Sequence, residues 1–561
     1  MIDFGILISP AFLISALITA LGGYSQYVVQ RAGFFSTAPA AFIAIGAYSS
    51  TYAIMTWHLP VVVAVLGAAL LTAVTGALLG MLVGRLRGAY VAIATLSVVL
   101  VVQQIAMVWT PVTGGALGIT NIPVWATLPV LVGLTAAVLV AVTVYEVSRP
   151  GRQQAAMRMD EVAAASTGVN VARGGVIASA FSGAIGGVAG AALAGNQFAI
   201  EPTGFGFGLV VSLLCAVVVG GYRSPLGPVL GSLVVVGLPL LLSSYALVAG
   251  TVVGLLTVLI LLFFPRGLAG VIPLTAESVA GAARALLRRG DGTAGEPGEG
   301  PSLLARRTGD LSAVSIARAY GSVRAVQDVS LHIRPGQVVG LIGPNGAGKT
   351  SVINLLAGVS ALDAGDLKLG GRDIARLPSY RLARAGVTRT FQACRLFPEM
   401  TVRQNVMMGA ISARDRHQRR RLPDEAATTV ALRTVGYQGS VHRRADELSY
   451  ADQRRVEIAR ALAAEPTFVL LDEPAAGMTA PEADDLGAVL RAISALGIGV
   501  LVIDHNVNWV FSICEHVSVQ HLGRLIAAGP PDTVRRDKVV IDAYTGTSGS
   551  EDLEEDARAR R

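Results

Sequence analysis

Charged residues are distributed very unevenly along this chain of 561 residues. Residues 1–274 contain nine Lys or Arg and five Asp or Glu, about 5% of that half, whereas residues 275–561 are about 24% charged. Because a soluble domain carries roughly 25% charged residues, only the second half has such a composition. The sequence therefore predicts a membrane domain followed by a soluble one. It excludes a disordered, collagen-like or disulfide-stapled protein.

The net charge of +7 is shared almost equally between the two halves. Neither half has the strong basic excess of a nucleic-acid-binding protein, so we expect no nucleic acid among the partners. The three cysteines, Cys215, Cys394 and Cys514, have no metal-binding spacing. They are interpreted as ordinary buried thiols.

The first half contains nine apolar segments that are long enough, or nearly so, to cross a bilayer. They are residues 8–29, 38–56, 60–83, 90–110, 127–147, 174–196, 207–221, 226–243 and 246–264. With the N-terminus outside, all nine arginines of this half fall on the cytoplasmic side, and the opposite loops carry only Glu201. The expected location is therefore the cell membrane, crossed many times, with the second half in the cytoplasm.

Glycines recur at four-residue spacing in these segments, as in Gly76-Gly80-Gly84, Gly186-Gly190 and Gly227-Gly231. Small residues with this period let membrane helices approach closely, so the pattern predicts helix packing rather than a substrate passage. The longest cytoplasmic loop, 149–173, is predicted to contain a short amphipathic helix from Met157 to about Ser166, ending near Gly168.

Residues 338–358 predict a buried strand, a glycine-rich turn and a helix. Gly343, Gly348, Lys349 and Thr350 have the P-loop spacing in the structural context that this motif requires. Its backbone N–H groups surround phosphates, the lysine reaches the β- and γ-phosphates, and the hydroxyl binds Mg²⁺. The predicted nucleotide-binding residues of this turn are Gly343, Pro344, Asn345, Gly346, Ala347, Gly348, Lys349, Thr350 and Ser351.

A second buried strand, FVLLDEP at 468–474, ends in two carboxylates. Asp472 is predicted to hold Mg²⁺ and Glu473 to orient and deprotonate the attacking water. The fold class is therefore an all-α polytopic membrane domain of about nine helices, followed by an α/β P-loop nucleotide-binding domain. The predicted domains are 1–274 (permease), 275–311 (an amphipathic and flexible linker), 312–546 (ATP-binding) and 547–561 (a disordered charged tail).

From residue 312 to 546 the chain resembles the ATPases of ATP-binding cassette (ABC) transporters, with six segments in the family's order. Besides the P-loop and the carboxylate strand, they contain Tyr320, Gln392, the segment LSYADQRR at 448–455 and His505. The resemblance implies that Tyr320 stacks on adenine and that Gln392 senses the γ-phosphate and Mg²⁺. It also implies that Lys349, Glu473 and His505 are catalytic, that Thr350, Gln392 and Asp472 serve the metal, and that ATP and Mg²⁺ are the cofactors.

Short sequence motifs in both halves are most similar to those of branched-chain amino acid importers. TRTFQACRLFPEMTVRQNV, LSY, EPAAGM and DAYTG resemble the G-type ATPase of these importers, whereas RAGFFSTAPAAFIAIGAY, LRGAYVAIATL, VVVGGYRSPLGPVLG and FFPRGL resemble their M-type permease. The loop with Asp160, Glu161 and Gly168 resembles the coupling helix, which docks on the ATPase near its glutamine loop. The resemblance implies a permease and an ATPase fused in one chain.

The signature departs from the family pattern. Ser449, Tyr450, Ala451 and Asp452 stand where G-type ATPases have Ser-Tyr-Gly-Gln, and Thr479 stands where many cassettes have Asp. In the family, two cassettes dimerise head to tail and each signature meets the partner's nucleotide. Ala451 adds a Cβ where backbone approaches closely, and Asp452 adds negative charge near an anion. We therefore expect a weakened signature beside complete Walker residues, with functionally neutral substitution as the alternative.

The implied partners are a second permease subunit, a second ABC ATPase subunit, an extracytoplasmic substrate-binding protein and membrane lipid; a homodimer of the fusion is the alternative. Branched-chain or other apolar amino acids are the expected substrates, with urea and short amides as the second choice. Gln103, Gln104, Asn196 and Gln197 are pathway candidates, although helix-end or packing roles are favoured. An exporter half-transporter and a membrane-tethered regulatory ATPase are the competing functional classes.

Overall fold

The computed structural model describes residues 9–84, 86, 88–241, 254–255, 259, 262–263, 267–270, 309–412 and 424–545. It divides into two compact units. The first contains residues 1–158 and 171–294, and the second contains residues 159–170 and 295–561. Apart from residues 309–311, the predicted linker 275–311 lies outside the described residues, and so does the predicted tail 547–561.

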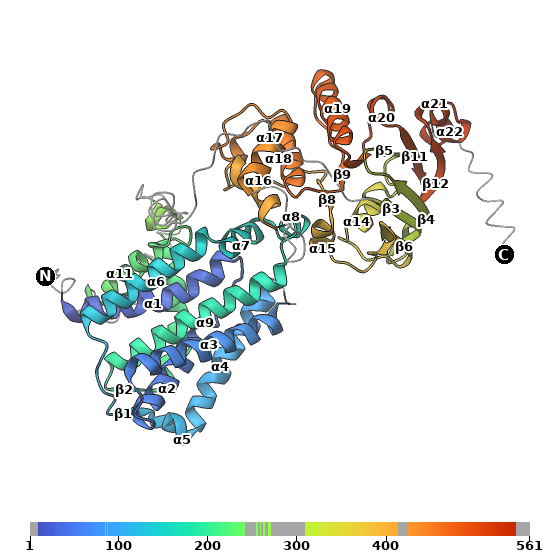
Figure 1. The fold of residues 1–561 in the computed structure, drawn as a ribbon. Coiled ribbons are helices and arrows are strands. Elements are labelled where there is room, and N and C mark those ends of the chain that lie inside the picture. The colour runs from blue at the N-terminus through green and yellow to red at the C-terminus, as the bar shows by residue number, and fades with distance from the viewer. Residues whose placement is uncertain are drawn as a thin grey trace, which may run out of the picture. The chain divides into compact units, whose positions relative to one another are not determined.

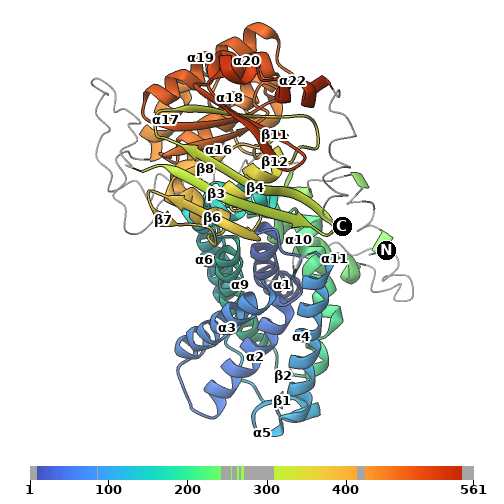
Figure 2. The ribbon, with the colours of Figure 1, turned by 90° about the vertical axis from the view of Figure 1, so that its right-hand side faces the viewer.

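The first unit is a bundle of apolar helices (Figures 1 and 2). Eight helices match eight of the nine predicted segments: α1 (Pro10–Arg31), α2 (Pro39–Met55), α3 (Val61–Val83), α4 (Ala89–Val108), α6 (Leu128–Val147), α9 (Val171–Asn196), α10 (Phe207–Gly220) and α11 (Gly227–Leu241). Five of them, α1, α3, α4, α6 and α9, are long and apolar enough to span a membrane. The ninth predicted segment, 246–264, lies almost entirely outside the described residues.

Helix α9 packs on α1, α2 and α3 at distances that only small residues allow. A Cβ on Gly190 would lie 2.0 Å from the Ile43 carbonyl oxygen, and one on Gly76 would lie 2.3 Å from that of Ser179. Ser25 and Ser182 add a hydroxyl contact of 3.0 Å between α1 and α9. Since lipid and helix surfaces are equally apolar, such close packing holds the bundle together. The packing predicted from the glycine spacing is confirmed at these positions.

The polar segment after α6 differs from the single helix predicted at Met157–Ser166. The structure has two helices, α7 (Arg149–Met159) and α8 (Glu161–Ser166). Asp160 separates them because its backbone is extended and its Oδ1 accepts the N–H groups of Val162 and Ala163, both at 2.9 Å. An N-cap of this kind starts a new helix.

The second unit contains two sheets, which Figure 2 shows. One is six-stranded, in the order β12-β11-β5-β10-β9-β8, and all neighbours are parallel except β12 on β11. Its strands are β5 (Val338–Ile342), β8 (Val387–Arg389), β9 (Phe468–Asp472), β10 (Gly499–Ile503), β11 (His516–His521) and β12 (Arg524–Gly529). The second sheet is antiparallel, in the order β4-β3-β6-β7, with β3 (Leu311–Tyr320), β4 (Val323–Ile333), β6 (Ala364–Leu369) and β7 (Arg372–Asp373).

Helix α14 (Lys349–Leu356) lies between the two sheets and shares one core with them. The opposite face of the parallel sheet is covered by a second core, to which α16 (Val402–Ser412), α17 (Asp424–Thr434), α18 (Tyr450–Leu462), α19 (Ala480–Ala495) and α20 (Val507–Ile513) contribute. Strands β5, β9 and β10 are buried along their whole length, as expected for a parallel sheet covered on both faces. The predicted α/β fold with its P-loop and carboxylate strands is confirmed.

Candidate nucleotide-binding and hydrolysis site

The predicted site residues meet where neighbouring parallel strands end. Leu341 of β5 pairs with Ile503 of β10, and Ile503 pairs with Asp472 of β9. The segments that follow these strands therefore leave the sheet side by side, at the edge where α/β folds bind ligands. This topology brings together the P-loop, the two adjacent carboxylates and His505.

The P-loop connects β5 to α14 through glycines in positive-φ conformations. A Cβ on Gly343 would lie 2.0 Å from the Gln520 carbonyl oxygen, and one on Gly348 would lie 2.1 Å from that of Ala325. Both positions therefore require glycine, on steric grounds and because of their φ angles of +154° and +101°. The tip residues Asn345 and Gly346 are exposed, so their backbone is open to a ligand.

Lys349 is the first residue of α14 and is buried. Its Nζ donates to the carbonyl oxygens of Gly343 at 2.7 Å and Pro344 at 2.9 Å. Burial lowers the pKa of this ammonium, while Glu473 and Asp472 oppose the shift. Thr350 is exposed in the same turn, and Ser351 follows it. The helix N-terminus and the ammonium together make a site for phosphate groups.

The two adjacent carboxylates have different surroundings. Asp472 is 1% exposed, and neither of its side-chain oxygens has a hydrogen-bond partner in the described part of the chain. Burial raises the pKa of this carboxyl, and Arg389, 3.6 Å away, opposes the shift. Buried unpartnered carboxylate oxygens are the chemistry that a hard cation requires. Asp472 is therefore suited to hold Mg²⁺.

Glu473 leaves the strand in a left-handed conformation, with φ +45° and its N–H donating to the Ile503 carbonyl at 2.7 Å. Unlike the Asp472 side chain, the Glu473 side chain is partly exposed. Gln392 Nε2 donates to Glu473 Oε2 at 3.0 Å, and His505 Nδ1 lies 3.9 Å from the same oxygen. The structure therefore brings Gln392, Glu473 and His505 together.

Tyr320 ends β3 in the antiparallel sheet, and the residue is 43% exposed. Its hydroxyl lies 3.1 Å from Ser360 Oγ, and the Arg318 guanidinium lies 5.1 Å from the ring centroid. Asp363 fixes Arg318 and also accepts the Ala319 N–H at 2.8 Å. The aromatic side chain is held in place with much of its surface accessible.

The signature residues form the start of α18. Ser449 is the N-cap, and its Oγ accepts the Asp452 N–H at 3.2 Å. Among the described residues, the side-chain hydrogen bonds of Ser449 and Tyr450 join them to their own helix, and none joins them to the P-loop. Thr479, the second departure, caps α19 in a capping box with Glu482. Thr479 therefore has a local structural role as a helix cap, whereas the cap of α18 is Ser449, which the usual signature also has.

Sequence reasoning missed the buried cluster that connects α18 to the glutamine segment. Glu457 accepts the N–H groups of Phe391 at 3.4 Å and Arg395 at 3.2 Å, and pairs with Arg454 at 2.8 Å. Arg454 in turn donates to the carbonyl oxygens of Phe391, at 2.5 Å, and Gln392. It also reaches the Glu473 carbonyl at 3.3 Å. Helix α18 is thus hydrogen-bonded both to the segment that carries Gln392 and to the backbone of Glu473.

One signal for this cluster was present in the sequence. Charged residues recur at Arg454, Glu457 and Arg460 within a helix whose other positions on that face are apolar. Charges at three-residue spacing on a buried face must pair with each other or with backbone groups. The backbone carbonyls that accept from Arg454 come from distant segments, so no local pattern could identify them.

The loop residues Asp160, Glu161 and Gly168 belong to the second unit, together with the cassette. Asp160 Oδ2 pairs with Arg395 Nη1 at 2.9 Å, and the Gly168 carbonyl accepts from Arg384 Nε at 2.8 Å. Helix α8 packs on α15 (Ser379–Ala385). Arg395 follows the glutamine segment by three residues, so the loop reaches the same backbone that Glu457 anchors.

The four predicted pathway residues lie in the first unit. Gln103 donates to the Pro202 carbonyl at 3.2 Å, and Asn196 donates to the Ala126 carbonyl at 3.1 Å. Gln104 and Gln197 are exposed. The bonds of Gln103 and Asn196 favour the structural alternative for these two residues.

Three family models match the chain. Residues 9–265 match the branched-chain amino acid transport system permease component, and residues 326–476 match the ABC transporter family. Residues 524–549 match a branched-chain amino acid ATP-binding cassette transporter model. The two halves thus match the two kinds of component that the sequence resemblance implied.

Curated relatives align with the second half. The high-affinity branched-chain amino acid transport ATP-binding protein BraF of Pseudomonas aeruginosa is 38% identical over 252 residues, 42% of this chain and 97% of that protein. The corresponding LivG of Salmonella typhimurium is 36% identical over 254 residues, again 42% and 97%. The lipopolysaccharide export ATP-binding protein LptB of Escherichia coli is 36% identical over 236 residues, with the same coverage. A solved ATP-binding cassette of an ABC transporter, in its ADP conformation, is 29% identical; the match covers 43% of this chain and all of that chain, with a TM-score of 0.39.

The Glu457 cluster yields a testable prediction. Glu457→Gln removes a buried charge from between Arg454 and Arg460 and loosens the backbone that carries Gln392. We expect kcat for ATP hydrolysis to fall about tenfold or more, equivalent to about 1.4 kcal/mol of transition-state stabilisation, with KM for ATP little changed. Steady-state hydrolysis by the full chain in lipid nanodiscs measures both constants.

Glu425→Gln is the matched control, because Glu425 also pairs with an arginine, Arg403, but at the surface with 59% of its side chain exposed. A surface pair contributes at most about 1 kcal/mol, so this variant should hydrolyse ATP normally. Equal rates for Glu457→Gln and Glu425→Gln would contradict the positioning role of the buried cluster.

Proposed function

Because the chain belongs to the ABC transporter family and joins a branched-chain amino acid permease to an ABC ATPase, we propose that it is one half of an ATP-driven importer for branched-chain or other apolar amino acids. The permease match over residues 9–265 carries this proposal. The cassette alone does not select a substrate, since it is as similar to an export ATPase as to LivG. The permease half distinguishes these alternatives.

We propose that the P-loop holds the nucleotide phosphates with its backbone N–H groups and with Lys349, and that Tyr320 stacks on adenine. Thr350, Gln392 and Asp472 are the residues that would hold Mg²⁺. The Asp472 oxygens, which have no hydrogen-bond partner among the described residues, fit this role, since Mg²⁺ is held by one or two carboxylates together with phosphates. The ion would supply charge neutralisation on the β- and γ-phosphates.

For hydrolysis we propose that Glu473 accepts a proton from the attacking water, and that Gln392 and His505 position the water and the γ-phosphate. The 3.0 Å bond from Gln392 to Glu473 supports this proposal, because the glutamine orients the carboxylate that receives the proton. General bases of this kind accelerate reactions by about 10²–10⁴-fold.

We propose that the loop residues Asp160, Glu161 and Gly168 transmit the state of this site to the membrane helices. The ion pair from Asp160 to Arg395 and the bonds from the Arg395 backbone through Glu457 to Arg454 support the idea. The proposed partners are a second permease, a second ATPase subunit and an extracytoplasmic binding protein. The proposed location is the cell membrane, with the cassette on the cytoplasmic side.

An uptake assay tests the importer proposal. In cells that naturally carry this chain, replacement of Glu473 by Gln should reduce ATP-dependent uptake of radiolabelled leucine to background, because the hydrolytic base is lost. The surface variant Glu425→Gln should transport normally. Lost urea uptake with unchanged leucine uptake would favour the short-amide alternative, and leucine accumulation in the Glu473→Gln strain would favour export.

The coupling loop yields a second prediction. Asp160→Asn keeps an acceptor that caps α8 as well as Asp does, but it removes the charge that pairs with Arg395. We expect basal ATP hydrolysis to stay near the wild-type rate and stimulation by substrate-loaded binding protein to fall about fivefold. Hydrolysis by the assembled complex in nanodiscs, with and without binding protein, measures this. The control is Glu425→Gln, which removes the surface ion pair with Arg403 outside the coupling loop and should retain full stimulation.

The altered signature yields a third prediction. We propose that the site completed by Ser449, Ala451 and Asp452 is the weaker of two composite sites, while the site built on Lys349 and Glu473 is active. Ala451→Gly with Asp452→Gln restores the usual signature without removing the Ser449 cap. The double variant should raise the ATPase rate of the assembled complex about twofold, since a second site becomes active. An unchanged rate would show that the natural residues are functionally neutral.

A further inference from the structure

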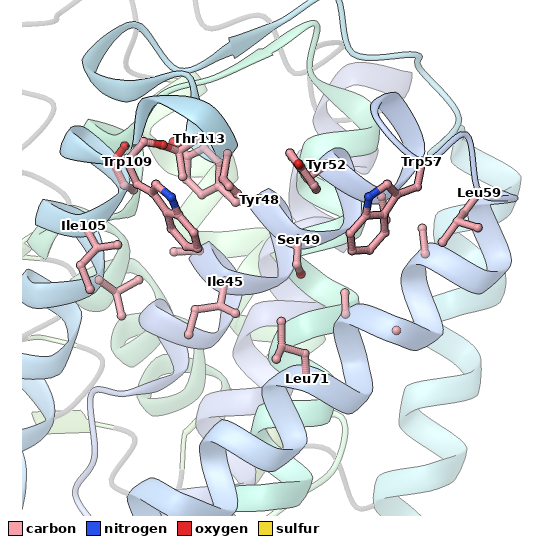
Figure 3. Close-up of a pocket in the computed structure, with 18 of the residues that line it drawn as sticks. Ile45, Tyr48, Ser49, Tyr52, Trp57, Leu59, Leu71, Ile105, Trp109 and Thr113 are labelled. Atoms are coloured by element: carbon pink, nitrogen blue, oxygen red, sulfur yellow. Dashed lines mark hydrogen bonds between the residues drawn. The ribbon is translucent and has the colours of Figure 1, made fainter.

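The first unit contains a large apolar cavity between α2, α3 and α4, with a volume of about 580 Å³. Figure 3 shows the rings of Tyr48 and Trp109 on one side of it and those of Tyr52 and Trp57 on the other, with Ile45, Ser49 and Leu71 between them. None of its lining residues is charged. Its volume falls within the ~300–1,000 Å³ range of pockets that bind small molecules.

Small residues on the facing helices create this cavity. Helix α3 contributes Ala64, Gly67 and Ala68, and a Cβ built on Gly67 would meet no atom within 4 Å. The cavity is open at its edge, since the lining residues Trp57 and Trp109 are more than half exposed, and its apolar wall is therefore accessible to a neighbouring molecule. Water fits this wall poorly, because it is mostly apolar and its few hydroxyl groups, such as that of Tyr48, offer too few hydrogen-bond partners. The occupant must itself be apolar.

The exposed residues around the cavity indicate that its occupant comes from the lipid bilayer. Outward residues of α3 and α4, such as Leu66, Leu70 and Leu100, are at least half exposed, and both helices are long and apolar enough to span a membrane. Trp57 precedes α3 and Trp109 follows α4, so two successive spans that cross in opposite directions place both tryptophans at the same membrane surface. Tryptophans at such positions lie at the boundary between head groups and acyl chains.

An amino-acid substrate fits this cavity poorly. Its ammonium and carboxylate groups would need charged or strongly polar partners, and burial without them is costly. We therefore infer that the cavity binds one acyl chain of a membrane phospholipid, which enters from the leaflet at the Trp57 and Trp109 end. The chain passes between α3 and α4 and reaches Ile45 and Ser49 on α2. This inference is independent of the importer proposal.

Photolabelling tests this inference directly. The full chain is placed in liposomes that contain a small fraction of phosphatidylglycerol with a diazirine in the middle of one acyl chain. After irradiation, labelled residues are mapped by mass spectrometry. Bulk lipid reaches Leu78 and Leu82 on the outer surface of α3, which are 54% and 75% exposed. Only a chain inside the cavity reaches Ile45 and Ser49, because α2 is otherwise covered.

Gly67→Phe should fill the cavity from α3 and reduce labelling of Ile45 and Ser49 at least tenfold, with labelling of Leu82 unchanged. Gly133→Phe is the matched control, since Gly133 on α6 is equally open and lies outside the cavity lining. If the Phe variant fails to assemble, Gly67→Ala and Gly67→Leu should reduce α2 labelling in proportion to the added volume.

Three results would overturn the inference. In the first, Ile45 and Ser49 are unlabelled in the wild type or equally labelled in Gly67→Phe. In the second, millimolar leucine suppresses their labelling, which would identify a substrate site. In the third, labelling disappears when the partner permease is assembled, which would show that protein side chains fill the cavity. Leucine uptake, measured separately with Glu473→Gln, keeps this result distinct from a failure of the importer proposal.

Discussion

The burial of Glu457 is the constraint on which the organisation of the second unit depends. Its carboxylate is 1% exposed and is surrounded by two backbone N–H groups and by the guanidinium groups of Arg454 and Arg460. A buried charge is tolerated only when it is fully paired and hydrogen-bonded. The segment that carries Gln392 therefore cannot move away from α18 without breaking the two N–H hydrogen bonds to this buried carboxylate. The hydrolysis site and the signature helix are held in a fixed relation for the same reason.

Much of this site could be predicted because its chemistry is local in sequence. Gly343 and Gly348 are required by backbone geometry, and Asp472 and Glu473 end a strand whose burial is visible as an apolar run. The different environments of the two carboxylates could not be predicted. They depend on the left-handed turn at Glu473 and on Arg389, which comes from the neighbouring strand β8.

In the first unit, composition predicted the helices but not the details of their contacts. Glycine spacing correctly indicated close packing, and the structure shows which carbonyls Gly76 and Gly190 approach. The break at Asp160 was missed, because apolar periodicity alone suggests one continuous helix. The cap that causes the break uses a side chain whose second oxygen is bonded to Arg395 in the distant cassette sequence. The cavity was also beyond sequence reasoning, since it results from small residues on different helices.

The placement of Met159–Asn170 has a consequence for how such a transporter is built. The chain passes between the two units three times, around residues 158, 170 and 294, so the loop and the cassette that binds it are parts of one polypeptide. Covalent linkage raises the effective concentration of the loop at its binding surface on the cassette, typically to the millimolar range for short flexible connections. Individual contacts, such as the ion pair between Asp160 and Arg395, can then be weak and still be formed most of the time. The fusion also fixes a one-to-one ratio of this permease to this ATPase, and a separate cassette would have to compete with one that is covalently attached.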